Sequence, residues 1–140
     1  MKEYHNFFSH LYQMIPKAKK VKVLIAEDME INILMYKGIL ENYYDLIIAK
    51  NGREAVEKYL ESEPDIIIMD ILMPEENGID AFNKIRLISK SVPIIALTVL
   101  NKKEEMNSIM EYGFNDYLVK PITSEKLLQT MEKYAAEIII

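Results

Sequence analysis

The sequence predicts an α/β fold built on a five-stranded parallel sheet. Five short apolar segments alternate along the chain with five segments of helical periodicity. Crossover connections that contain a helix join parallel strands, so this alternation favours a parallel sheet. The segment 66–69 consists of four apolar residues between Pro64-Asp65 and Met73-Pro74, as is typical of a strand buried on both faces.

Residues 1–20 precede the first strand and are expected to be a helical extension or a linker, with the main domain at 21–140. Apolar residues at helical spacing predict a short amphipathic helix that ends at Pro16. These residues are Tyr4, Phe7, Phe8, Leu11, Met14 and Ile15. Lys17, Lys19 and Lys20 then form a solvated connector. Packing on its own domain, contact with a partner and a dimer contact remain open for this helix.

The first half of the domain begins with a strand at 21–26 that runs directly into Glu27 and Asp28. A helix is expected from about residue 29 to residue 41, on the basis of an apolar stripe at helical spacing. The residues of this stripe are Ile31, Leu34, Met35, Ile39 and Leu40. A strand at 45–49 follows, and the Asn51-Gly52 turn opens a helix through residue 60.

The second half begins with the strand that ends at Asp70. A loop at 75–78 leads into a helix, followed by a strand at 93–98 that ends at Thr98. A more polar helix from about 102 to 112 stops at Gly113, a residue suited to a helix C-cap. The last strand, 116–119, leads into Lys120, and a final helix begins near Thr123, which supplies cap chemistry.

Composition narrows the classes of function. A chain of 140 residues with 50% hydrophobic residues suits one globular domain. The net charge of -5 argues against direct nucleic-acid binding, which needs a basic face. The absence of cysteine excludes disulfides and fits a cytoplasmic protein. No apolar run approaches a membrane span, and we expect no secretory signal.

Polar side chains follow four of the predicted strands, at the ends that meet at one edge of a parallel sheet. They are Glu27, Asp28, Asp70, Thr98 and Lys120. Two like charges about 4 Å apart repel by roughly 4 kcal/mol at an effective dielectric near 20, so three acids together need a cation. Oxygen ligands without His or Cys point to Mg²⁺ or Mn²⁺. Asp70, between the expected metal and the donors, is the natural nucleophile for phosphoryl transfer.

Each of these residues also has an ordinary structural interpretation. The acids are suited to turns and helix caps, Thr98 to a strand end, and Lys120 to solvent. Each interpretation is reasonable alone. All of them together would require several coincidences at one sheet edge, so the functional interpretation is favoured.

Four separated motifs carry these residues in a fixed order. They are Val-Leu-Ile-Ala-Glu27-Asp28, Ile-Ile-Ile-Met-Asp70-Ile-Leu-Met-Pro74 with Gly78, Pro93-Ile-Ile-Ala-Leu-Thr98, and Gly113-Phe-Asn-Asp-Tyr117-Leu-Val-Lys120-Pro121. As a set they resemble the receiver domain of two-component response regulators, over about residues 21–136. The resemblance implies a flavodoxin-like, doubly wound fold with strand order 2-1-3-4-5 and helices on both faces.

The resemblance also implies a phosphorelay function. Asp70 would accept a phosphoryl group from a histidine kinase or histidine phosphotransfer protein, and the chain would catalyse only its own phosphorylation and dephosphorylation. Asp28, Asp70 and the backbone carbonyl of Leu72 would bind Mg²⁺, with Glu27 acting through a metal-bound water.

A conformational switch is implied as well. Lys120 would pair with the phosphoryl oxygens and Thr98 would swing in to donate a hydrogen bond. Tyr117 would follow Thr98, changing the surface of helix 102–112, strand 116–119 and the final helix. A downstream target protein would recognise that surface.

Some positions depart from the usual family pattern. Glu27 replaces the more usual Asp, and Glu76-Asn77 precede Gly78 where Met-Asp is common. Val99 follows Thr98 where a small Ala is usual, and its bulk would hinder the phosphoryl donor or the threonine movement. Leu72 and Leu100 occupy positions that tune hydrolysis in this family. Since neither apolar side chain can orient a water, we predict slow hydrolysis.

Alternative functions fit less well. A flavin carrier needs a Ser/Thr/Gly-rich phosphate loop after the first strand, where this chain has Glu27-Asp28-Met29-Glu30. An aspartyl phosphatase usually has a second acid two residues after the nucleophile, and Leu72 stands there. A degenerate docking receiver is disfavoured because no site residue is missing. A stand-alone regulator, a module of a hybrid histidine kinase and a homodimer all remain open.

Overall fold

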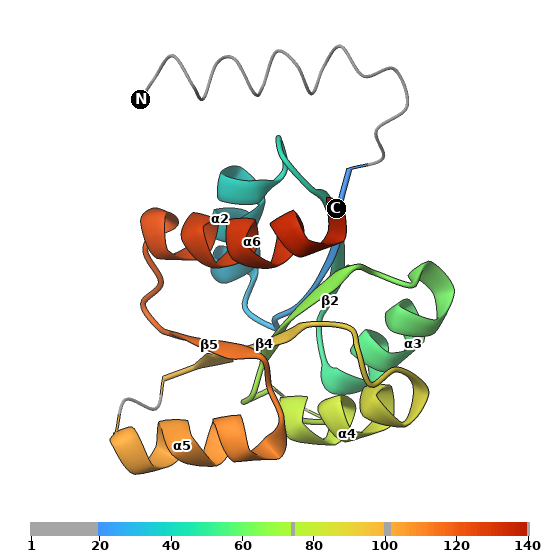
Figure 1. Cartoon of the computed structure of the whole chain (residues 1–140), viewed down its shortest axis with the longest axis vertical. Helices are drawn as coiled ribbons and strands as arrows, with labels where there is room; N and C mark the ends of the chain where they lie inside the picture. The colour runs from blue at the N-terminus through green and yellow to red at the C-terminus, as the bar shows by residue number, and fades with distance from the viewer. Residues whose placement is uncertain (1–19, 74, 100–101, 140) are drawn as a thin grey trace.

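The structure, a computed structural model, describes residues 20–73, 75–99 and 102–139 (Figure 1). Strands and helices alternate along them as predicted. The strands are β1 (Lys22–Ala26), β2 (Asp45–Ala49), β3 (Ile66–Asp70), β4 (Ile94–Thr98) and β5 (Asp116–Val119). The helices are α2 (Glu30–Leu40), α3 (Gly52–Ser62), α4 (Gly78–Ile88), α5 (Lys103–Tyr112) and α6 (Ser124–Ile139). The predicted N-terminal helix and Leu100 lie outside the described residues.

The five strands form one parallel sheet in the order β2-β1-β3-β4-β5, which confirms the predicted fold class. The chain moves outward from β1 to β2 and then returns to place β3 on the other side of β1. The direction of winding therefore changes between β1 and β3. In open α/β sheets the carboxyl ends of the strands at such a point form the usual ligand crevice.

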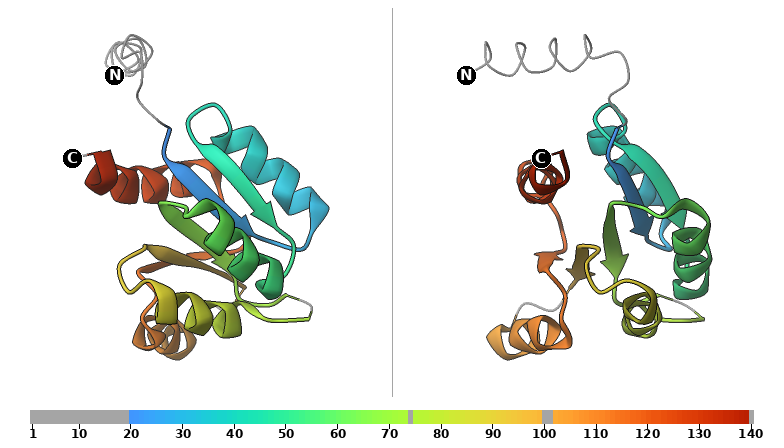
Figure 2. Two further views of the ribbon diagram at one scale, coloured as in Figure 1. Left: turned by 90° about the vertical axis from the view of Figure 1, so that its right-hand side faces the viewer. Right: turned by 45° about the vertical axis from the view of Figure 1, so that its right-hand side comes forward.

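Two helical layers cover the sheet, with α2 and α6 on one face and α3, α4 and α5 on the other (Figure 2). Side chains alternate along each strand between the two faces. In β1, Val23 and Ile25 belong to the core under α2 and α6, whereas Leu24 and Ala26 belong to the opposite core. Among the described helices, none has the length and hydropathy needed to span a bilayer.

Local capping explains several element boundaries. Asn51 Oδ1 accepts a hydrogen bond of 2.8 Å from the backbone N–H of Glu54, which fixes the start of α3. Asn77 Oδ1 accepts bonds of 3.0 Å from the N–H groups of Ile79 and Asp80 at the start of α4. Gly113 ends α5 with a φ of 109°, a left-handed conformation that glycine adopts without strain.

The apolar stripe that predicted helix α2 is buried only at its C-terminal end, where Leu40 is fully buried and Ile39 packs against the core. Ile31, Leu34 and Met35 are 68%, 57% and 38% exposed. The residues that α2 buries against the sheet are Ile33, Tyr36 and Leu40. Because α2 carries apolar residues on both of its sides, helical spacing alone does not distinguish the face that packs on the sheet.

Candidate functional site

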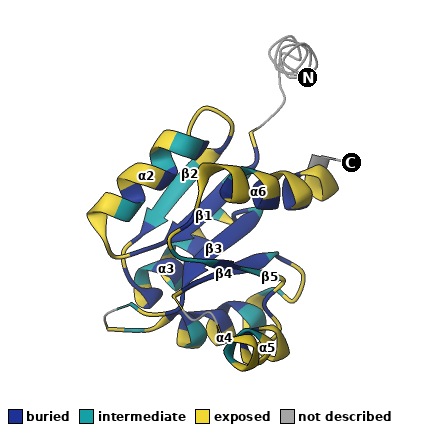
Figure 3. Ribbon diagram, turned by 90° about the vertical axis from the view of Figure 1, so that its left-hand side faces the viewer, coloured by how far each residue is buried: buried dark blue, intermediate teal, exposed yellow. Residues whose placement is uncertain are grey.

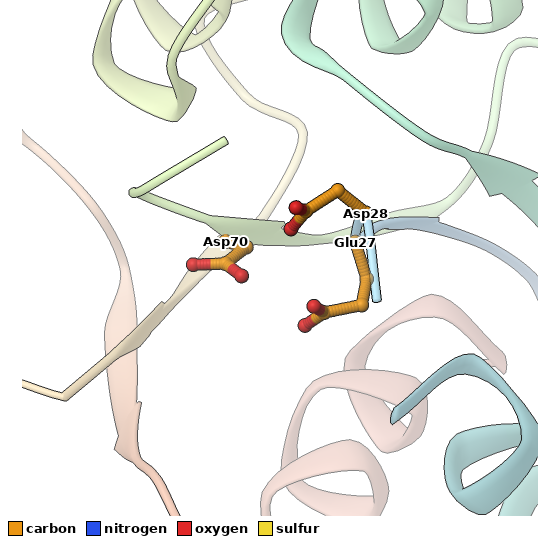
Figure 4. A group of neighbouring side chains, drawn as sticks. All are labelled: Glu27, Asp28 and Asp70. Carbon is orange, nitrogen blue, oxygen red and sulfur yellow. The ribbon is translucent and has the colours of Figure 1, made fainter. Parts of the chain in front are cut away.

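Three carboxylates meet at the carboxyl edge of the sheet, as the sequence predicted. Glu27 and Asp28 directly follow β1, and Asp70 is the last residue of β3, the neighbouring strand. Each offers an oxygen atom, and these oxygens all lie within 4.8 Å of one another. Figure 4 shows the three carboxylates facing a common space. Glu27 and Asp70 are buried, whereas Asp28 is exposed, so the group is accessible from one side.

Lys120 joins this cluster from the end of β5. Its Nζ lies 2.6 Å from Asp70 Oδ2 and 2.9 Å from Glu27 Oε2. The backbone N–H of Lys120 donates a 2.7 Å hydrogen bond to the carbonyl of Thr98, which holds the backbone of Lys120 against the end of β4. Lys120 thus links the two buried acids through charge-assisted hydrogen bonds.

Glu27 has further partners on α2 and at Met29, the residue that precedes α2, that the sequence did not identify. Its Oε1 accepts bonds from the backbone N–H of Met29 at 3.2 Å and from Asn32 Nδ2 at 3.3 Å. The Tyr36 hydroxyl donates to Glu27 Oε2 at 3.5 Å. Asn32 and Tyr36 stand four residues apart on one face of α2. This spacing in the sequence could have indicated that both side chains reach the same group. These contacts orient Glu27 toward Lys120.

Electrostatics distinguish Asp70 from an ordinary surface acid. The pKa of Asp70 is raised from 3.8 to about 6, mainly by burial. The hydrogen bond from Lys120 opposes this rise, and the negative charge of Glu27 adds to it. Burial lowers the pKa of Lys120, but its hydrogen bonds to Asp70 and Glu27 and the negative charges of both acids together outweigh burial, so that pKa is raised.

The donor set fits a divalent cation. Three carboxylates and one ammonium leave a local charge of about -2 when all are ionised. The ligands on offer are oxygens, and one of the acids is open to solvent. Hard cations such as Mg²⁺ prefer such oxygen ligands and retain several waters.

The remaining predicted residues surround this cluster. Thr98 is buried at the end of β4, directly after Leu97, the residue that pairs with Asp70 across the strands. Tyr117 is half-buried on β5 and packs against the core under α3, α4 and α5. Leu72 is exposed, and its backbone N–H donates to Asp70 Oδ1 at 3.2 Å. Val99 is exposed and lines a cavity together with Lys120.

Gly78 allows the loop between β3 and α4 to close tightly against the site. Its N–H donates a 2.9 Å hydrogen bond to the carbonyl of Ile71. A Cβ at this position would collide with the backbone carbonyl of Asp70. The glycine is therefore required by close backbone approach, and it keeps α4 next to the carboxyl end of β3.

Comparison with known proteins agrees with this geometry. The family model for the response regulator receiver domain matches residues 23–132, most of the chain. The chain belongs to the response regulator receiver family. It is 38% identical over 114 residues to the chemotaxis protein CheY of Thermotoga maritima, covering 80% of this chain and 95% of that CheY. The chain is thus a CheY-like receiver domain of two-component signalling.

Solved receiver structures share its fold. The receiver domain of the sensor histidine kinase PA1611 from Pseudomonas aeruginosa, with a magnesium ion coordinated in its active-site cleft, matches with a TM-score of 0.77 and 28% identity. That match covers 84% of this chain and 98% of the PA1611 domain. A chain of the CheX-CheY-BeF3-Mg²⁺ complex from Borrelia burgdorferi matches with the same TM-score and identity, over 82% of this chain and 89% of that one.

Proposed function

We propose that this receiver accepts a phosphoryl group on Asp70 from the phosphohistidine of a histidine kinase or histidine phosphotransfer protein. An Asp70 carboxylate oxygen attacks phosphorus, the phosphorus–nitrogen bond breaks, and the imidazole leaves with the bonding electron pair. The observation that carries this proposal is the position of Asp70. It ends β3 at the crevice, between the acids of β1 and the ammonium of Lys120.

The residues around Asp70 would neutralise the negative charge of the phosphoryl group. Lys120 Nζ, now 2.6 Å from Asp70 Oδ2, is close enough to pair with phosphoryl oxygens attached to that carboxylate. Asp28, Asp70 and the Leu72 carbonyl would hold Mg²⁺, with Glu27 acting through water. When bound, the ion supplies positive charge that offsets the phosphoryl and carboxylate charges. The magnesium ion in the PA1611 receiver supports this assignment.

The output follows from the residues next to the site. Thr98 would donate to a phosphoryl oxygen, and Tyr117 would move with it, which changes the surface formed by α5, β5 and α6. Tyr117 lies on β5, which is part of this surface, and Thr98 ends β4, the strand that pairs with β5. A downstream target protein would then bind one state preferentially. The CheX-CheY-BeF3-Mg²⁺ complex supports the binding of a partner protein by a receiver of this fold.

The chain would act as a signalling protein of the cytoplasm that turns over no substrate besides its own phosphate. It acts either as a stand-alone regulator or as the receiver module of a hybrid histidine kinase. Its similarity to CheY over most of both chains supports the first arrangement, and its similarity to the PA1611 receiver supports the second.

Intact-mass measurement after incubation with acetyl phosphate and Mg²⁺ tests the chemistry. We expect a gain of one phosphoryl group, lost in Asp70→Asn and in the presence of a chelator. Asp45→Asn, which alters an exposed carboxyl at the start of β2, is the matched control and should be phosphorylated normally. No gain in wild-type protein that binds Mg²⁺ would contradict the proposal and indicate a docking scaffold.

A further inference from the structure

Glu27 is a buried carboxylate, and each of its two oxygens accepts two hydrogen bonds. Its side chain is 0% exposed. Oε1 accepts from the backbone N–H of Met29 and from the Asn32 amide. Oε2 accepts from Lys120 Nζ at 2.9 Å and from the Tyr36 hydroxyl at 3.5 Å. Because a charge removed from water is costly without such donors, the loss of one donor has to be compensated by another.

Lys120 is the donor that phosphorylation would take from Glu27. Its Nζ contacts both Glu27 Oε2 and Asp70 Oδ2. A phosphoryl group on Asp70 has a charge of about -2, so it attracts the ammonium more strongly than the single charge of Glu27 does. Tyr36 and Lys120 both line a cavity of about 330 Å³. The Lys120 side chain therefore has space to shift without displacing packed side chains.

We propose that Tyr36 is a positioning residue for phosphoryl transfer, whose hydroxyl becomes the side-chain donor to Glu27 Oε2 when Lys120 turns to the phosphoryl group. This inference rests on the proposed phosphorylation of Asp70. The Tyr36 hydroxyl keeps Glu27 hydrogen-bonded in its buried position. Lys120 can then leave this carboxylate without exposing an uncompensated charge to the core.

The position of Tyr36 in the core supports this role. Tyr36 is one of the residues that α2 buries, together with Ile33 and Leu40. Helices α2 and α6 cover the same face of the sheet, whose central strands β1 and β3 are buried (Figure 3). Tyr36 is 2% exposed in that core. An apolar side chain could fill such a position, whereas a buried hydroxyl is tolerated there because it has a partner, Glu27.

The hydroxyl is also ready to donate a stronger bond than it makes now. Burial, together with the negative charges of Glu27 and Asp70, raises the pKa of Tyr36 above its ordinary value, so the hydroxyl keeps its proton. Its distance of 3.5 Å from Glu27 Oε2 is longer than the usual O–H···O range of about 2.5 to 3.0 Å. Lys120 holds the same oxygen at 2.9 Å. Once Lys120 releases this oxygen, we expect the bond from Tyr36 to shorten.

A double-mutant cycle in metal-free protein tests the inference without phosphorylation. Lys120→Met removes the ammonium from Glu27, as phosphorylation is proposed to do. In urea unfolding with a chelator, Tyr36→Phe should lower the unfolding midpoint at least about twice as far in Lys120→Met as in the wild type. The matched control is Tyr134→Phe, which removes another buried hydroxyl, one that donates to the carbonyl of Asn115 at 2.9 Å. It should lower the midpoint equally in both backgrounds. Equal effects of Tyr36→Phe in both backgrounds would overturn the inference, whether or not the chain is phosphorylated.

Binding of beryllofluoride, a mimic of the phosphoryl group, gives a second readout. In calorimetry at saturating Mg²⁺, Tyr36→Phe should raise the dissociation constant of beryllofluoride about tenfold, because Glu27 then loses a hydrogen bond to its buried charge. Tyr134→Phe should leave that constant unchanged. Wild-type protein that binds no beryllofluoride would contradict the proposed function and this inference with it. Equal affinity in wild type and Tyr36→Phe would refute this inference alone.

Discussion

Replacement of Asp70 by Asn should stabilise the metal-free protein at neutral pH. Asp70 is only 4% exposed, and folding raises its pKa from 3.8 to about 6. Because the pKa is higher in the folded state, the protonated carboxyl favours folding. That contribution is complete below about pH 4 and is lost as the pH rises through about 6.

The size of the effect follows from the pKa. A rise of about two pKa units means that the ionised carboxylate costs about 3 kcal/mol in the folded state. Asn keeps the shape of the side chain without this charge, and Lys120 retains Glu27 Oε2 at 2.9 Å as its partner. This pKa already includes the attraction of Lys120 for Asp70, and the amide of Asn is a weaker partner for Lys120 than the carboxyl group, so we expect a gain of about 1 to 3 kcal/mol at neutral pH.

Urea unfolding with a chelator, followed by circular dichroism between about pH 4 and pH 8, measures this difference. The gain should be largest at the neutral end and near zero at the acidic end. Asp45→Asn should change the free energy of unfolding by less than about 0.5 kcal/mol throughout. An Asp70→Asn variant that is less stable than wild type at neutral pH, or a gain that does not vary with pH, would refute the reasoning.

Three other predictions concern the loop, the metal and the phosphate. In urea unfolding, Gly78→Ala should lower the free energy of unfolding by about 1 to 3 kcal/mol, because its Cβ would clash with the Asp70 carbonyl. Gly38→Ala, whose Cβ would have open space around it, should raise the free energy of unfolding by about 0.5 to 1 kcal/mol. Asp28→Asn should weaken Mg²⁺ binding at least about tenfold by calorimetry, and wild-type affinity should fall below about pH 6 as protons compete at Asp70. The phosphorylated protein should persist well beyond seconds, because Leu72 cannot orient water; rapid loss of the added mass under native conditions would contradict this.

The sequence was most informative where the determinants of structure are local. The apolar segment at 66–69 is buried in β3, and Asn51 and Gly113 cap α3 and α5 as their residue types indicate. The acids and Lys120 meet because strand ends in a parallel sheet share an edge. Their cluster could therefore be predicted from strand boundaries alone.

The sequence was less informative where the outcome depends on which face of an element packs. Glu27 and Asp28 are adjacent acids, yet Glu27 is fully buried and Asp28 is exposed. The turn into α2 directs Glu27 toward Tyr36 and Lys120. The contact between Glu27 and Lys120 joins positions far apart in the sequence, so local patterns do not predict it. The same limitation applies to α2, because helical spacing identifies apolar stripes without showing which of them is buried against the sheet.

Charge balance at the site links phosphorylation to the proposed switch. Three ionised carboxylates and Lys120 give a charge of about -2, which one Mg²⁺ ion would neutralise. Phosphorylation of Asp70 replaces a singly charged carboxylate with a phosphoryl group of charge about -2, so the occupied site becomes negative again by about one unit. That excess charge favours movement of a further hydrogen-bond donor toward the phosphoryl oxygens. Thr98 ends β4, the strand that pairs with both β3 and β5, and its displacement is what would carry the signal to β5 and α5.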